Sequence, residues 1–374
     1  ANHVEGYKGT YCRLIEPTSQ QGKEEMFLAG QNRYTANQDD FAKIPGSPVA
    51  YWVSEKVFEA FTSSKLLNEV AKPRQGLATS DNDRFLRLWH EVENTKIGYD
   101  VKSVKDENEY KYKWFPCTKG GSYRRWYGNN DYVVNWENDG FEIKEFAARL
   151  YKSYTKRIAN IPFYFHHGLS WSTISSGLFS LRYVPDGFIF ETKGAMCFVS
   201  DTDINYVLGL YNTKVIQMFL SVVSPTLDYH EGPLGRTPIL IKDNKDIDWL
   251  VDECIHSSKE DWDSFETSWD FTTHPLVSMS KGLWDATATA ATMDYYYGYL
   301  PEASCPLEIC YLLWQGQCKE RFEKLKANEE ELNRIFIDIY GLQDELTPEV
   351  EEKDVTVRKA DLQRDIKSLL SYAV

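Results

Sequence analysis

The stretch GFIFETKGAMCFVS, residues 187–200, decides how the middle of this chain folds. Aromatic and β-branched residues dominate it and glycine bounds it, a pattern that is typical of β-strands. The stretch DYVVNWEND, residues 131–139, has the same composition between asparagine and aspartate. Residues 74–245 are therefore predicted to form a domain of mixed strands and loops. Within it, the apolar spacing of residues 204–222 predicts a helical hairpin or one broken helix, which Pro225 stops.

Helical patterns flank this middle domain on both sides. In YWVSEKVFEAF, residues 51–61, apolar side chains recur on one helical face, and a proline–glycine break near Pro73 predicts a domain boundary. In NEEELNRIFIDIYGL, Asn328 is predicted to cap a helix and Gly341 to end it. The predicted fold class is α+β, in three segments: a helical connector at residues 1–73, the strand-and-loop domain at 74–245 and a helical region at 246–374.

The bulk composition excludes several classes of protein. Hydrophobic content of 42% and aromatic content of 14% argue against disorder. No apolar run reaches the roughly 18 residues that a membrane helix needs, and no signal peptide is recognisable at the start. None of the seven cysteines forms a CxxC pair, so reduced thiols and a cytoplasmic location are expected, without a zinc site.

Charge is unevenly distributed along the acidic chain, whose net charge is −14. Residues 74–182 hold 17 Lys/Arg against 13 Asp/Glu, a net of +4, whereas residues 246–374 hold 12 against 27, a net of −15. A phosphate-binding face needs only local positive charge, so the mildly basic centre permits nucleic-acid binding without requiring it.

The common catalytic signatures are absent. There is no glycine-rich dinucleotide motif or P-loop, no GxSxG elbow and no HExxH pair. His166 and His167 are adjacent, so on a strand they would face opposite ways and could not chelate one metal; polar contacts or structural roles are expected. Asp186, Glu191 and Lys193 resemble a nuclease metal site in composition, but their spacing favours a turn that enters a strand with an exposed lysine.

The cysteines near the helical end resemble a metal cluster only superficially. Cys305, Cys310 and Cys318 fit no standard zinc spacing and lie among helix-forming residues. Buried thiols are the better interpretation.

The most unusual stretch is KGGSYRRWYGNND, residues 119–131, which concentrates positive charge, glycine and aromatic residues in an acidic protein. Three interpretations are consistent with it: a phosphate-binding loop, a loop that contacts base edges in a DNA groove, and a charged surface hairpin. Two other polar segments share its region, RQGLATSDNDRF and HHGLSWSTISSG. Their hydroxyl, amide and basic side chains suit contacts to phosphates and base edges, but polar surface loops have the same composition.

Four long stretches resemble a known family. PRQGLATSDNDRFLRLW, KWFPCTKGGSYRRWYGNNDYVVNWENDG, GLSWSTISSGLFSLRYVPDGFIFETKG and LGLYNTKVIQMFLSVVSPTLDY are similar to the target-recognition region of PglX-type adenine-specific DNA methyltransferases of bacteriophage-exclusion (BREX) systems. SKEDWDSFETSWDF and NEEELNRIFIDIYGL resemble the helical segments that follow in that family and in related fused restriction–modification enzymes. The resemblance covers nearly the whole chain.

The resemblance implies a methyltransferase part rather than a complete enzyme. Family members use S-adenosylmethionine and an Asn-Pro-Pro-Tyr-like motif, and neither motif occurs here, so the catalytic half is expected upstream of Ala1. The implied role is recognition of a double-stranded DNA site for N6-adenine methylation, with no cofactor in this part, no membrane and other BREX proteins as further partners. The alternatives are a protein-interaction scaffold, the specificity part of a fused restriction–modification enzyme, and a restriction endonuclease.

The resemblance also implies which residues contact DNA. Lys119, Arg124 and Arg125 are expected to contact phosphates or guanines, and Tyr123, Trp126 and Tyr127 mainly to pack and stiffen the loop. The remaining expected contacts are the base-edge amides Asn129 and Asn130, the close-approach glycines Gly120 and Gly121, and, in second rank, Gln75, Thr79, Asn82, Ser170, Ser172 and Thr173.

Overall fold

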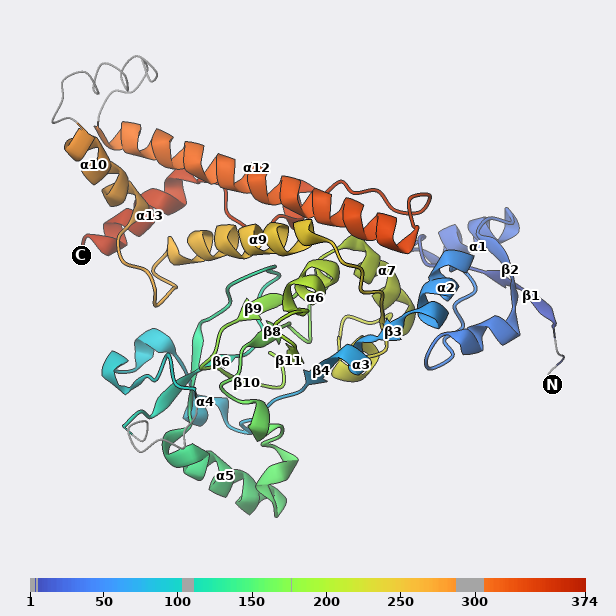
Figure 1. Ribbon diagram of the computed structural model, residues 1–374, viewed down its shortest axis with the longest axis horizontal. Coiled ribbons are helices and arrows are strands. Elements are labelled where there is room, and N and C mark those ends of the chain that lie inside the picture. Colours follow the sequence, from blue (N-terminus) through green and yellow to red (C-terminus); the bar gives the residue numbers. More distant parts are fainter. Residues whose placement is uncertain (1–3, 5, 103–110, 176, 287–305) are drawn as a thin grey trace.

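The computed structural model describes residues 4, 6–102, 111–175, 177–286 and 306–374. Within them the chain forms an α+β fold, which confirms the predicted class. Two long helices run along one side of a pair of small sheets, and an N-terminal unit lies at one end of the longer helix (Figure 1).

The N-terminal unit mixes strands with helices. Strands β1 (Lys8–Cys12) and β2 (Arg33–Asn37) pair antiparallel, with helix α1 (Gln20–Leu28) between them in sequence. A mainly helical segment was predicted here, but the Thr and Tyr residues of both strands suit a pleated ribbon better than a helix. The predicted helix at residues 51–61 is confirmed as α2 (Glu55–Ser63), which buries one apolar face. Before α2 lies η1 (Gln38–Lys43). After it the chain continues through β3 (Lys65–Leu66), α3 (Leu67–Val70) and β4 (Ala71–Arg74).

The middle of the chain builds two four-stranded sheets, with orders β10-β6-β7-β5 and β4-β11-β8-β9. The stretch at residues 187–200 supplies β10 to the first sheet, parallel to β6, and β11 to the second, between β4 and β8. One short segment therefore joins the two sheets. The strands are β5 (Leu86–Leu88), β6 (Trp114–Thr118), β7 (Tyr132–Asn135), β8 (Gly168–Ser170), β9 (Arg182–Val184), β10 (Ile189–Phe190) and β11 (Met196–Val199).

Short helices and loops surround these sheets. The longest of them is α5 (Glu137–Tyr151), at the outer end of the first sheet (Figure 1). The others are α4 (Asn82–Phe85), η2 (Trp89–Glu91), η3 (Asn94–Lys96), η5 (Tyr154–Lys156) and η6 (Ile161–Phe163).

The predicted broken helix is confirmed as α6 (Ile204–Tyr211) and α7 (Lys214–Val223), which bend by 76° and end just before Pro225. After them, α8 (Glu231–Leu234) leads to β12 (Pro238–Ile239), which pairs with β3. No single helix among the described residues is long and apolar enough to cross a membrane; only the bent α6–α7 pair passes that test, by length and composition.

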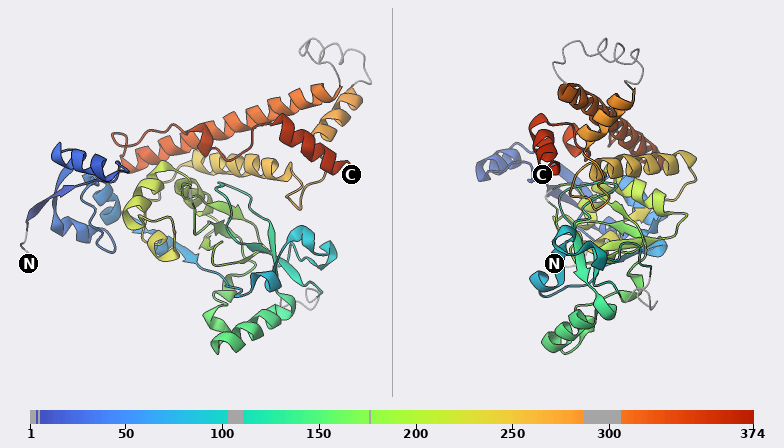
Figure 2. Two further views of the ribbon diagram at one scale, coloured as in Figure 1. Left: turned by 180° about the vertical axis from the view of Figure 1, so that it is seen from behind. Right: turned by 90° about the vertical axis from the view of Figure 1, so that its left-hand side faces the viewer.

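The helical C-terminal region packs on the second sheet through α6. Helix α9 (Lys245–Asp263) lies between the sheet side and α12 (Pro306–Tyr340), as Figure 1 and the left view of Figure 2 show. Gly341 ends α12 with a positive φ of 66°, as predicted, but the predicted cap at Asn328 is wrong. Asn328 lies inside α12, because the apolar stripe continues upstream through residues such as Trp314 and Phe322. The remaining elements are α10 (Pro275–Ala286), η7 (Glu352–Asp354) and α13 (Leu362–Tyr372).

The largest cluster of buried side chains draws on all three predicted segments. It joins Phe61 of α2 to Phe219 of α7, Val251 of α9 and Phe336 of α12. A second cluster fills the first sheet around Phe115. The division into three domains stays a prediction, and the shared cluster shows that the segments pack on one another closely.

Candidate nucleic-acid interface

The three polar segments singled out in the sequence converge on residues 190–194. The Glu191 amide donates at 3.0 Å to the carbonyl of Thr118, the residue directly before the 119–131 segment, and the Thr192 amide donates to the Leu77 carbonyl at 2.9 Å. From the third segment, the Thr173 amide donates to the Lys193 carbonyl at 3.0 Å. Segments that are far apart in sequence are thereby brought to one end of the paired sheets.

Glycines allow this close approach of loops. Gly120 has a φ of +84°, and a Cβ there would lie 2.6 Å from the Lys193 carbonyl oxygen. A Cβ on Gly194 would lie 2.5 Å from the Thr118 backbone. Gly121, with a φ of +135°, is exposed, and its carbonyl accepts a 3.1 Å hydrogen bond from the Ser172 hydroxyl. Only Gly121 of the two predicted glycines therefore offers its backbone to solvent.

Two lysines flank a buried carboxylate at this end of the sheets. Lys193 is exposed and Lys119 partly exposed, whereas the side chain of Glu191 is buried and accepts a 2.6 Å hydrogen bond from the Lys193 amide. Burial raises the pKa of Glu191, and this backbone hydrogen bond and the positive charges of Lys119 and Lys193 oppose the rise. Lys193 had been interpreted from sequence only as an exposed lysine after a turn, and that placement is confirmed.

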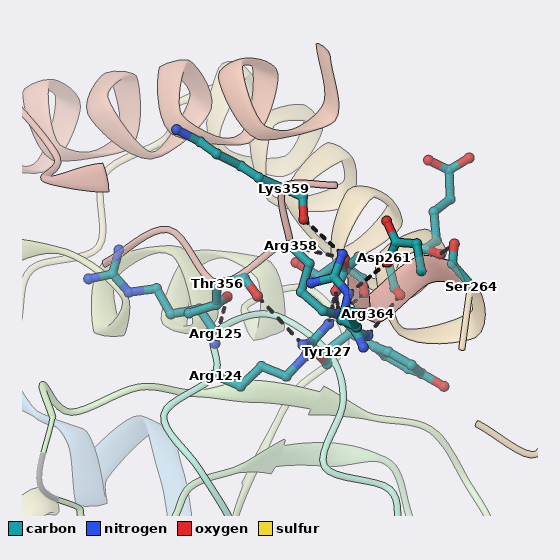
Figure 3. Close-up of polar contacts among 12 residues, drawn as sticks. Arg124, Arg125, Tyr127, Asp261, Ser264, Thr356, Arg358, Lys359 and Arg364 are labelled. Carbon is teal, nitrogen blue, oxygen red and sulfur yellow. Dashed lines mark hydrogen bonds and ion pairs between the residues drawn. The ribbon is translucent and has the colours of Figure 1, made fainter. Parts of the chain in front are cut away.

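Arg124 and Arg125 do not lie on this surface. Arg124 Nη2 forms a 2.7 Å ion pair with Asp261 of α9, and Arg125 Nη1 forms a 2.8 Å ion pair with Glu329 of α12. The first of these pairs is drawn in Figure 3. Both guanidinium groups are buried, so the structure corrects the expectation that they face DNA: their charges are already neutralised inside the protein.

The other predicted contacts differ in exposure. Asn82 is exposed and Gln75 partly exposed, so both remain accessible to a ligand. Asn129 is buried, has a φ of +60° and donates to the Ser122 carbonyl, which makes it a loop-stabilising residue. The remaining predicted residues are buried: Asn130, Thr79, Ser170, Ser172 and Thr173.

The aromatic residues of the loop have the packing role that was expected. Trp126 and Tyr127 are buried, and Trp126 belongs to the largest core cluster. Arg182, which the sequence did not single out, lies fully buried beneath the loop and donates to the Arg124 carbonyl at 3.2 Å. Burial lowers the pKa of Arg182 to about 10, and the nearby Arg124 charge adds to this.

His167 makes polar contacts and two of the three C-terminal cysteines are buried, as the sequence predicted. His167 lies between two carboxylates, with Nδ1 2.9 Å from Asp186 and Nε2 2.9 Å from Asp201. Cys310 and Cys318 are buried, as predicted, and Cys305 lies outside the described residues. Across the described ranges, no three His, Cys, Asp or Glu side chains are grouped to hold a metal ion.

Sequence reasoning missed the partners of the two arginines. Asp261 and Glu329 follow Arg124 and Arg125 by 137 and 204 residues. The only signal was regional: a basic centre and a strongly acidic C-terminal region in one chain. Ion pairs between the two regions compensate part of these opposite charges.

Comparison with known proteins identifies the class. No family model matches the chain. The adenine-specific methyltransferase PglX of Lacticaseibacillus casei (strain Zhang) is 41% identical over 379 residues, which is 99% of this chain and 30% of that protein. The adenine-specific methyltransferase BrxX of Escherichia coli O9:H4 (strain HS) is 31% identical over 350 residues, 92% of this chain and 26% of that protein.

The chain therefore belongs to the adenine-specific methyltransferase family that PglX and BrxX represent, and the resemblance found in its motifs is confirmed. It spans less than a third of the length of either relative.

Proposed function

We propose that this chain recognises double-stranded DNA for an N6-adenine methyltransferase of a BREX-type phage-defence system. The observation that carries the proposal is the convergence of three family-typical polar segments on residues 190–194. Beside them, the exposed Lys193 and the partly exposed Lys119 supply positive charge, and Gly121 supplies an exposed backbone. Lysines and backbone groups are the usual partners of phosphates, whereas Gln75 and Asn82 have the amides that read base edges.

The proposal assigns the chemistry to the rest of the parent enzyme. S-adenosylmethionine would bind there, and the target adenine would have to leave the base stack to reach it. This chain would place the duplex, because Lys119, Lys193 and the exposed Gly121 form a basic edge beside the segments that carry the resemblance. Other BREX proteins are further proposed partners.

The test replaces the two lysines of this edge, Lys119 and Lys193, by glutamine. Lys119→Gln with Lys193→Gln should weaken duplex binding about tenfold at low salt, because two phosphate contacts are lost. The slope of log Kd against log salt should fall by about two for the same reason. Both quantities follow from fluorescence anisotropy of a labelled duplex at several salt concentrations.

The matched control is Lys23→Gln with Lys367→Gln. These two lysines are exposed on α1 and α13, and neither forms an ion pair with another of the described residues. Their replacement changes the net charge equally. The control should bind almost as the unaltered chain does. Equal losses in both variants, or no loss in either, would contradict the proposed interface and favour the interaction-scaffold alternative.

A further inference from the structure

The inner part of the 119–130 loop, residues 123–130, has a backbone conformation that its own sequence disfavours; residues 119–122 form the outer part. Trp126 has a φ of +70°, a conformation that a bulky aromatic residue rarely adopts. Gly128 and Asn129 also have positive φ angles. Such conformations persist where the surrounding structure holds them, and they concentrate at functional sites.

One carboxylate of the helical region holds the centre of this path. Glu329 of α12 accepts a 2.8 Å hydrogen bond from Arg125 Nη1 on one oxygen and a 2.7 Å bond from Trp126 Nε1 on the other. The Glu329 side chain is almost fully buried. Two consecutive loop residues are therefore fixed by two atoms of one side chain.

The neighbouring loop residues are held from the same region. Asp261 of α9 binds Arg124, and the Thr356 hydroxyl accepts a 3.2 Å hydrogen bond from the Arg125 amide (Figure 3). The Tyr123 hydroxyl reaches the Asp354 carbonyl at 3.5 Å. Residues 123–126 thus contact the C-terminal region at four successive positions, directly beside residues 119–122, of which Gly121 and Ser122 are exposed.

We propose that Glu329 and Asp261 are positioning residues for DNA recognition, which fix the outer part of the loop by clamping its inner part. This rests on the proposed function, because the clamped loop carries Lys119. The acidic helical region would then act on the DNA-contacting surface through the protein interior, without touching DNA itself.

Stability alone is a weak explanation for this arrangement. Buried ion pairs are often replaceable by apolar residues without loss of stability, because desolvation of the charges offsets their attraction. Their geometry is less easily replaced: a carboxylate with both oxygens bound to adjacent residues fixes direction as well as distance.

The experiment replaces the pair by apolar residues and follows the loop directly. The variant Arg125→Met with Glu329→Leu removes both charges of this pair and leaves only the Trp126 Nε1–H without its acceptor, so its urea midpoint should fall only slightly below that of the unaltered 374-residue chain. Amide hydrogen exchange of residues 124–127, where the Arg125 amide donates to Thr356 and the Trp126 amide to the Leu181 carbonyl, should become at least tenfold faster when measured by mass spectrometry. Duplex binding should weaken at least tenfold.

Unchanged exchange and unchanged affinity in the folded double variant would overturn the proposal. If that variant does not fold, the single variant Arg125→Met serves, because burial already raises the pKa of Glu329 and the lone carboxyl can take up a proton. The same loss of protection is expected there, and its absence overturns the proposal. The exchange result needs no DNA, so it separates failure of this inference from failure of the lysine test.

Discussion

The two halves of the 119–130 loop have similar composition and opposite environments. In the outer half Gly121 is exposed and Lys119 partly exposed, whereas Arg124 and Arg125 in the inner half are buried against carboxylates. The difference arises outside the loop, because α9 and α12 bring Asp261 and Glu329 to the inner half only. A basic, glycine-rich stretch can therefore be part ligand-binding surface and part domain contact.

The largest expected effect comes from the inner half. Asp261 accepts hydrogen bonds from Arg124 Nη2 at 2.7 Å and from Arg358 Nε at 3.1 Å, and its other oxygen accepts from the Arg358 amide. Asp261→Asn would leave the buried Arg124 guanidinium and the partly exposed Arg358 guanidinium without their counter-charge. The free energy of unfolding in urea should fall by on the order of 3–5 kcal/mol.

Asp248→Asn is the matched control on the same helix. Asp248 is exposed in the first part of α9, so its replacement should change stability by less than about 0.5 kcal/mol. Similar unfolding curves for the two variants would show that the buried ion pairs do not distinguish the inner half from the surface.

A smaller effect is expected at the outer half. Glu191→Gln keeps an oxygen that can accept the Lys193 amide but removes the negative charge between Lys119 and Lys193. Duplex affinity should rise about two- to fivefold at low salt, because phosphates would meet less compensated positive charge. Anisotropy titrations against the unaltered chain measure the change, and weaker binding by a folded variant would argue against a phosphate contact here.

The smallest effect concerns a surface contact outside the loop. Burial alone would lower the pKa of His167, but hydrogen bonds to Asp186 and Asp201 outweigh it and raise the pKa. A raised pKa contributes stability that is fully present below the unfolded value of about 6.5 and is lost as the pH rises through the folded value. His167→Asn should therefore cost more stability at pH 6 than at pH 8.5.

The cost should stay below about 1 kcal/mol, because the side chain is one-third exposed and solvent screens the pairs. Thermal unfolding at the two pH values measures it, with His256→Asn on the exposed face of α9 as the control. A pH-independent difference would show that His167 contributes packing rather than charge.

The sequence predicted local structure well where period and composition agree. The strand composition of residues 187–200, the apolar faces of α2, α6 and α7, and the glycine stop at Gly341 are all realised. It failed at Asn328, because a capping pattern can occur inside a longer helix whose core-facing stripe continues through it. It also missed β1 and β2, whose short two-stranded ribbon has a weak pattern.

The candidate site was predictable only in outline. The three polar segments were found from composition and family resemblance, and the structure brings them together. Which members face solvent could not be found that way, since Lys119 and Arg124 carry the same charge in the same loop.

The sequence by itself determined the fold class, the family and the basic stretch, because these depend on local periodicity, composition and motif similarity. Only the tertiary structure decided that Arg124 and Arg125 lie inside while Lys119 and Lys193 lie outside. The physical reason is that a buried charge requires a partner, and these partners, Asp261 and Glu329, come from helices more than 130 residues away. Such partners are set by how the helices pack, which no local pattern encodes.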